Sequence, residues 1–255
     1  FNCPAATCNH LVAGSYRVWE TLTGAVPNTW TAVSGDLTKN TLGNRSFINQ
    51  LAFAPTDTTV VAVGTNDGNV QYGTSINTGA MGTWTNLTLS NAVLPNRPIL
   101  DVAISPASAT TVLAAVGGFD QNTAATPGHV FQASCASACT TAASWTWANK
   151  TGNLPNVPAD SIIANPRFPQ QVFVGTDWGL YFTNDINVPS PVWQKFTAGL
   201  PNVMIWDMSV DRGAGANPLT SSTTLALFTR SRGAYAWPLP SGPITPVALQ
   251  ELEIE

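Results

Sequence analysis

Short apolar runs separated by turn residues recur along the chain, most clearly between residues 151 and 207. This segment contains the same three residues twice, Leu-Pro-Asn at 154–156 and at 200–202. Between the two copies, runs rich in β-forming residues predict four short strands, at 161–164, 171–175, 180–183 and 192–196. No run shows the spacing of three to four residues that is typical of an amphipathic helix. The segment therefore predicts a four-stranded antiparallel meander.

The same order of runs occurs on both sides of this segment. The sequence Val-Ala-Val-Gly-Thr-Asn-Asp-Gly at 61–68 repeats Val-Phe-Val-Gly-Thr-Asp-Trp-Gly at 172–179. A repeated four-stranded meander with a period of roughly 40–50 residues is typical of a β-propeller. We therefore predict an all-β propeller with about five blades of four antiparallel strands, the first and last incomplete, at about 1–37, 46–90, 97–150, 157–198 and 203–238. The tail, 241–255, is expected to form a closing edge strand or a linker.

The low charge of the chain narrows the classes of partner. Only 9% of the residues are charged, the net charge is −4, and no run of lysine or arginine occurs. Such a chain lacks the basic surface that nucleic acids and anionic membranes attract, so neither is an expected partner. No apolar run reaches the roughly 18 residues of a membrane span.

Four cysteines fall into two local pairs, Cys3 with Cys8 and Cys135 with Cys139. Other connectivities are open on paper, but the local pairing is the natural one. Disulfides form in oxidising compartments, so we expect a secreted protein, either extracellular or periplasmic. No CxxC motif is present and histidine is scarce, so we predict neither a metal site nor a cofactor.

The turns between second and third strands should lie on the same rim of the propeller as the links between blades. This rim would carry aromatic, amide and guanidinium groups, which suit a carbohydrate or protein ligand. The candidate binding residues are Arg17, Asp67, Asn96, Arg97, Asn156, Trp178, Asn202, Arg230 and Arg232. The alternative is that these side chains cover blade edges and cap turns.

One position of the first strand of each blade should face the central channel, and it holds Gln50, Asp101, Ser161 and Asp207. A glycosidase needs two carboxylates roughly 5–9.5 Å apart. Asp101 and Asp207 are two blades apart, with a serine between them, so we interpret both as structural carboxylates that accept bonds from loop amides. Glu20, near Tyr16 and Arg17, is interpreted as a packing residue. No catalytic residue is predicted, and we favour a protein that is not an enzyme.

The repeat resembles the Asp-box or BNR family of β-propellers, which includes sialidases, xyloglucanases and sortilin-type receptors. The best Asp-box copy is Thr183-Asn184-Asp185 followed by Trp193, whereas the copies that end at Trp84 and Trp145 lack the aspartate. The resemblance implies the fold and leaves the activity open, because the family contains both glycosidases and proteins that only bind.

The function that we expect is non-catalytic recognition or assembly by an exported module, with a carbohydrate or protein ligand on the loop rim. One alternative is a fragment of a glycoside hydrolase whose missing N-terminal blades carried the acid and the base. Another is a structural subunit whose open blade edges pair with other chains.

Overall fold

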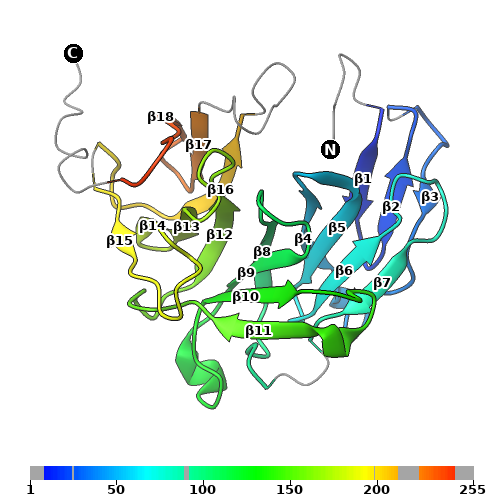
Figure 1. The fold of residues 1–255 in the computed structure, drawn as a ribbon, viewed down its shortest axis with the longest axis horizontal. Coiled ribbons are helices and arrows are strands. Elements are labelled where there is room, and N and C mark those ends of the chain that lie inside the picture. The colour runs from blue at the N-terminus through cyan, green and yellow to red at the C-terminus, as the bar shows by residue number, and fades with distance from the viewer. Residues whose placement is uncertain (1–8, 25, 89–91, 198, 212–223, 245–255) are drawn as a thin grey trace.

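The computed structural model describes residues 9–24, 26–88, 92–197, 199–211 and 224–244. These residues form five antiparallel sheets that follow one another in chain order (Figure 1). The sheets stand around a common centre, and the first and fifth lie at the two ends of the arc. The all-β architecture that the sequence predicts is confirmed. Among the described residues, no helix has the length and apolar character that crossing a membrane requires.

Three of the five sheets have four strands. The second sheet holds β4 (Ile48–Ala54), β5 (Asp57–Thr65), β6 (Val70–Thr74) and β7 (Thr83–Asn86). The third holds β8 (Ile99–Ile104), β9 (Thr111–Val116), β10 (Val130–Cys135) and β11 (Trp145–Asn149). The fourth holds β12 (Ala159–Ala164), β13 (Val172–Thr176), β14 (Gly179–Thr183) and β15 (Gln194–Lys195).

The two outer sheets have three described strands each. The first holds β1 (Leu11–Gly14), β2 (Val18–Thr21) and β3 (Thr31–Ala32). The fifth holds β16 (Ile205–Val210), β17 (Thr224–Thr229) and β18 (Ala234–Pro238). Short 3-10 turns lie in the loops, at Gly43–Arg45, Asp120–Thr123 and Ala142–Ser144. As expected, the first sheet lacks an inner strand and the fifth lacks an outer one, within the described ranges.

Apolar side chains are buried between each sheet and the next. The second strands β5, β9 and β13 are covered on both faces, and this explains why their sequences are nearly continuous apolar runs. The repeat is also visible in three dimensions. Leu154 packs in the cluster between the third and fourth sheets, and Leu200 packs in the cluster between the fourth and fifth. The two Leu-Pro-Asn copies therefore occupy the same place at successive interfaces.

Small residues allow neighbouring sheets to approach closely. A Cβ atom on Gly64 would lie 2.5 Å from Cγ2 of Ile99, the residue that begins the next sheet. A Cβ atom on Gly175, in the fourth sheet, would lie 2.7 Å from the carbonyl oxygen of Ile205, which begins the fifth sheet. A side chain at either glycine would collide with the next sheet, and this explains why the sequence Val-Gly-Thr ends the second strand of both blades.

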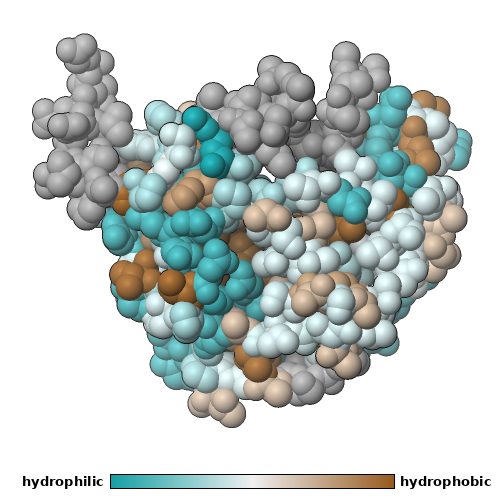
Figure 2. Space-filling model, viewed as in Figure 1, coloured by the Kyte–Doolittle hydropathy of each residue, from teal (hydrophilic) through white to brown (hydrophobic). Residues whose placement is uncertain are grey.

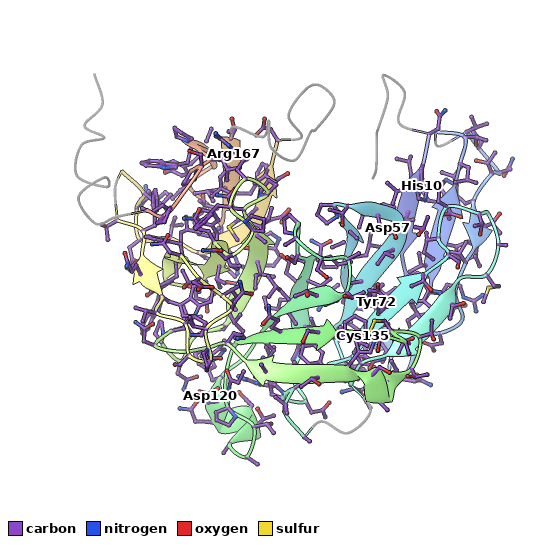
Figure 3. All side chains as sticks on the ribbon, viewed as in Figure 1. His10, Asp57, Tyr72, Asp120, Cys135 and Arg167 are labelled. Carbon is purple, nitrogen blue, oxygen red and sulfur yellow. A yellow bond between two sulfur atoms is a disulfide. The ribbon has the colours of Figure 1, made fainter. Side chains whose placement is uncertain are left out.

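The third sheet carries the described disulfide, Cys135–Cys139, as predicted. Cys135 lies near Tyr72 of the neighbouring sheet (Figure 3), and both belong to the core cluster between the second and third sheets. Cys3 and Cys8 lie outside the described residues. Most of the predicted tail strand, 245–255, also lies outside them. Residues 241–244 form no strand, although Ile244 is held by two hydrogen bonds between its backbone and the Asn184 side chain, of 2.8 and 2.9 Å.

Candidate functional site at the channel mouth

The inner strands β4, β8, β12 and β16 line a central channel, and each has a β-bulge near its first residue. In β12, for example, Ala159 pairs with Thr176 and Ser161 pairs with Gly175, so Asp160 is an extra residue without a partner in the register. The four extra residues are Asn49, Leu100, Asp160 and Trp206. The residue after each of them is the predicted channel position, so the register places these four at equivalent points.

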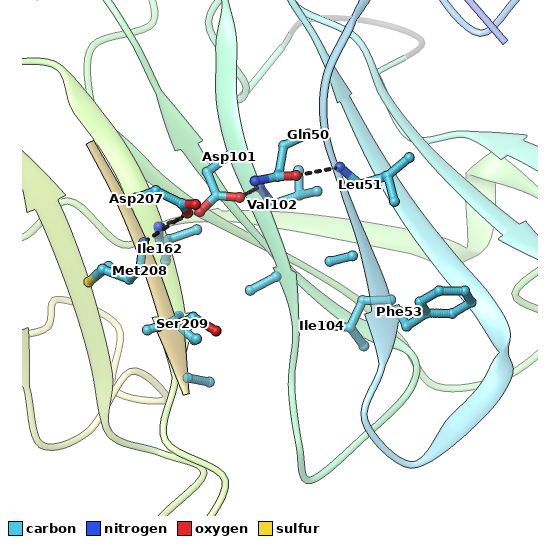
Figure 4. Close-up of a pocket in the computed structure, with 14 residues that line it drawn as sticks. Gln50, Leu51, Phe53, Asp101, Val102, Ile104, Ile162, Asp207, Met208 and Ser209 are labelled. Atoms are coloured by element: carbon cyan, nitrogen blue, oxygen red, sulfur yellow. Dashed lines mark hydrogen bonds between the residues drawn. The ribbon is translucent and has the colours of Figure 1, made fainter. Parts of the chain in front are cut away.

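The bulges project side chains into a cavity of about 410 Å³ at the channel mouth. It is lined by Phe47, Asn49, Gln50, Leu100, Asp101, Asp160, Trp206 and Asp207. A second cavity of about 300 Å³ continues along the inner strands, and most of the residues that line it are apolar (Figure 4). Gln50, Asp101 and Asp207 line both cavities and therefore lie where one meets the other.

Asp101 joins neighbouring sheets from the centre of the channel. Its Oδ1 accepts a hydrogen bond from the Val102 amide and its Oδ2 accepts one from the Ile162 amide, both at 2.7 Å. It is also bonded to the Gln50 side chain (Figure 4). The interpretation of Asp101 as a structural carboxylate that bonds amides agrees with these contacts.

The pKa of Asp101 is raised to about 8. Burial is the largest cause of the rise and the Asp207 charge adds to it, whereas the hydrogen bonds from Ile162, Val102 and Gln50 oppose it. Burial also raises the pKa of Asp207, whose Oδ1 accepts the Met208 amide at 2.8 Å. Asp101 and Asp207 belong to the third and fifth sheets, two blades apart as the sequence indicates. The inner strands converge on the axis, and the Asp101 side chain reaches across to the fourth sheet, so the two groups face each other (Figure 4).

Asp160 differs from Asp101 because part of its carboxyl group lacks a partner. Its residue is only 8% exposed, and among the described residues Oδ2 has no hydrogen-bond partner. Burial is the main cause that raises the pKa of Asp160, to about 7, and the Asp177 carboxylate adds to it. Asp160, which lines the cavity, therefore carries a buried carboxylate oxygen with unused capacity to accept hydrogen bonds.

Exposed aromatic rings complete the mouth. Trp206 is 61% exposed and Phe47 is 48% exposed, although both sit beside buried strands. Large apolar side chains exposed at the edge of a concave site are typical of ligand contact. Asn49, in contrast, is engaged within the protein, since its Nδ2 donates to the Ile99 carbonyl at 2.8 Å and links the second sheet to the third.

Several predicted rim residues remain accessible. Trp178 is 54% exposed, and the electrostatic effect of Asp177 on Asp160 places this turn next to the mouth. Arg230 and Arg232 are exposed on the turn between β17 and β18. The Arg17 guanidinium stacks on the Tyr16 ring, 4.7 Å from its centre.

Other predicted rim residues hold the loops together. Asp67 is buried and accepts hydrogen bonds from the Thr65 hydroxyl at 2.6 Å and the Lys39 amide at 2.9 Å. Arg97 is buried and donates to the Gly128 carbonyl and, at 3.3 Å, to Asp120. Burial removes Asp67 and Arg97 from the candidate binding residues.

The three rim asparagines are exposed, but each already bonds a neighbouring group. Asn96 accepts from Lys39 Nζ at 2.8 Å and Asn202 accepts from Lys195 Nζ at 2.7 Å. Asn156 bonds the His129 ring and the Asp120 amide, both in the loop between β9 and β10. These contacts fit the alternative that the sequence left open, in which such side chains support the turns.

Glu20 bonds residues other than Tyr16 and Arg17. Its buried carboxylate is 2.7 Å from His10 Nε2 and accepts the amides of Asn77, at 2.5 Å, and Gly79, at 2.8 Å, on the second sheet. Its interpretation as a packing residue is confirmed. Within the described ranges, no group of three or more histidine, cysteine, aspartate or glutamate side chains is placed to hold a metal ion.

Comparison with known proteins identifies the architecture. No protein-family model and no curated protein matches the chain. Among solved structures, Sqt1 from Chaetomium thermophilum matches with a TM-score of 0.65 at 14% identity, over 99% of this chain and 58% of Sqt1. The same Sqt1 bound to the N-terminus of ribosomal protein L10 matches with a TM-score of 0.63 at 15% identity, over 94% of this chain and 58% of that one. The β-propeller domain of Cps50 (Swd1) from Myceliophteria thermophila matches with a TM-score of 0.61 at 11% identity, over 99% of this chain and 71% of that domain.

The fold is a β-propeller. At these identities the likeness shows the fold alone, and the chain spans about 58% of the length of Sqt1. The resemblance to Asp-box propellers stays a prediction, because these comparisons do not test it. The expectation of a secreted, extracellular or periplasmic location is contradicted, since the similar propellers include one in complex with a ribosomal protein segment. A disulfide that closes a five-residue turn does not by itself identify a compartment.

Proposed function

We propose that this propeller is a non-catalytic recognition module that binds an extended segment of a protein partner at the channel mouth. The observation that carries the proposal is the mouth cavity, which is lined by Trp206 and Phe47, both exposed aromatic residues, and by Asp160, whose Oδ2 has no partner among the described residues. Aromatic anchors around a small number of polar groups are typical of sites that dominate the binding energy of protein interfaces. The surface around such a site is expected to contribute less, and the face seen in Figure 2 is mostly polar with scattered apolar residues.

The solved propellers support a peptide segment as the ligand. Sqt1, which shares this fold, has been solved with the N-terminus of ribosomal protein L10 bound to it. A cavity of about 410 Å³ accommodates one or two side chains of such a segment, while the remainder would lie across the rim near Trp178.

The paired carboxyl groups of Asp101 and Asp207 invite comparison with a glycoside hydrolase, in which one acid has a raised pKa. The bonding of Asp101 argues against that role. A general acid has to reach the leaving oxygen, whereas both oxygens of Asp101 are occupied by backbone amides in the core of the fold. We therefore assign Asp101 to holding the inner strands β8 and β12 together.

The proposal is tested by selection from a random peptide display library on the wild-type protein. The selected peptides are then titrated against the wild type, Trp206→Ala and the control Val192→Ala. Val192 is 65% exposed in the loop between β14 and β15, outside the residues that line the mouth. We expect Trp206→Ala to weaken binding about 10-fold or more, as for an aromatic anchor, and Val192→Ala to change it less than 2-fold.

Failure of the selection, or equal losses in the two variants, would contradict the proposal. A glycan array probed in parallel tests the alternative that the ligand is a carbohydrate. Binding to a glycan that Trp206→Ala abolishes, in the absence of any peptide binding, would replace a protein partner by a carbohydrate one.

A further inference from the structure

The mouth of the channel is acidic and contains no cation of its own. Of the residues that line it, three are aspartates and none is lysine or arginine. Asp177 adds a fourth carboxylate beside Asp160. The three carboxyl groups that line this cavity and the fourth beside Asp160 repel one another, and a positive charge placed among them would stabilise their ionised forms.

Arg230 is close to the mouth, because its amide donates to the Met204 carbonyl at 3.0 Å, but it is not among the residues that line the cavity. Lys195 bonds Asn202 at 2.7 Å and lies over the Tyr181 ring. Arg97, in the link between the second and third sheets, contacts Asp120. The acidic mouth therefore lacks a neutralising partner within the residues that line it.

Among the aspartates that line the mouth, Asp160 has an oxygen with unused hydrogen-bonding capacity. Oδ2 of a residue that is more than nine-tenths buried has no hydrogen-bond donor among the described residues, and the residue lines the cavity. Trp206 lines the same cavity from the equivalent bulge of the next sheet. A cation between a carboxylate and an indole ring gains both an ion pair and a cation–π contact.

We infer that the bound segment is anchored by a lysine ammonium or an arginine guanidinium group seated between Asp160 and Trp206. The inference rests on the proposed function and specifies the chemistry of the ligand. An organic cation fits the site better than a bare metal ion, because aromatic rings form part of the walls and hard metal ions need a shell of oxygen ligands. The alkyl stem of lysine or arginine would lie along Phe47 or Leu100.

The test uses the peptides that bind the wild-type protein. In each, every lysine is replaced by norleucine and every arginine by citrulline, which keep the stem and remove the charge. Both versions are titrated against the wild type and Asp160→Asn by calorimetry. We expect the neutral peptide to bind the wild type at least 10-fold more weakly, and Asp160→Asn to bind the two versions within about 3-fold of each other, since the removed charges interact directly.

The outcomes separate this inference from the proposed function. Peptides that lose affinity for Trp206→Ala but need no cation would overturn the inference and leave the proposed function in place. Absence of any peptide binding would overturn both. Asp177→Asn is the matched control, because it removes a neighbouring charge from an accessible turn and should reduce the preference for the cation much less than Asp160→Asn does. Asp160→Ser provides a second variant, so that a folding defect in Asp160→Asn does not decide the result.

Discussion

Substitution of Gly175 by alanine tests the close approach of the sheets on which the mouth is built. The added Cβ atom would lie 2.3 Å from the Ser161 hydroxyl, 2.7 Å from the Ile205 carbonyl oxygen and 2.8 Å from the Ile205 Cβ atom. Two of these three atoms belong to the next sheet, and one is a backbone atom that cannot rotate away. The whole of β16 would have to shift, and β16 carries Trp206 and Asp207.

The expected magnitude follows from two opposing effects. Overpacking a well-filled core costs about 1–3 kcal/mol, and a backbone contact places this site at the upper end. Replacing glycine by alanine also lowers the conformational entropy of the unfolded chain, which raises the free energy of unfolding by about 0.4–1 kcal/mol. The net loss in the free energy of unfolding is about 2 kcal/mol. For a chain of this size it corresponds to a decrease in Tm of roughly 4–8 °C.

Thermal and urea unfolding of Gly175→Ala, followed by circular dichroism, would measure this loss. The control is Gly35→Ala, because a Cβ atom there has no neighbour within 4 Å. We expect the control to unfold at or slightly above the wild-type temperature. If Gly175→Ala were as stable as the control, the packing of β16 against β13 described above would be wrong.

Three further predictions concern stability. Replacing Cys135 and Cys139 together by alanine opens a five-residue loop and should cost about 2 kcal/mol, measurable as a lower urea midpoint that reducing agent does not lower further. The pKa of Asp101 is raised to about 8 and that of Asp160 to about 7, so the folded state retains protons that the unfolded state releases. The contribution of these two groups to the free energy of unfolding is therefore complete below about pH 4 and is lost as the pH rises to about 8. Urea midpoints measured from pH 4 to 9 should show this decline, and Asp101→Asn should reduce it; an unchanged slope would contradict the assignment. Glu20→Gln removes charge from a buried carboxylate that binds a histidine and two amides, and should cost about 2 kcal/mol, seen as faster amide hydrogen exchange in the first two sheets.

Much of the fold could be predicted because the strands are short, alternate with turns and repeat. The predicted strands at 171–175 and 180–183 match β13 and β14 to within one residue. Glycine at the end of the second strand was also visible in the sequence, although its reason, the next sheet's backbone, appears only in three dimensions.

The site was harder to predict because bulges change which side chains reach the channel. In the sequence, nothing distinguishes Asp160 and Trp206 from the residues beside them. Only the strand register shows that each is an extra residue of a bulge at the mouth. A charged residue and a tryptophan next to buried apolar strands were the available signal. The burial of Asp67 and Arg97 could not be foreseen, since a turn sequence does not show whether its side chain points into the loop or into water.

Under the proposed function, the bulge in each inner strand would separate ligand recognition from folding. The extra residue takes no part in strand pairing, and at Leu100, Asp160 and Trp206 no described hydrogen bond ties the side chain to the framework. Substitutions at these three positions would therefore alter the chemistry of the mouth while leaving the sheets and their register intact. The same scaffold is in this respect well suited to directed evolution, because a small library at three codons would sample new ligand preferences with little risk to stability.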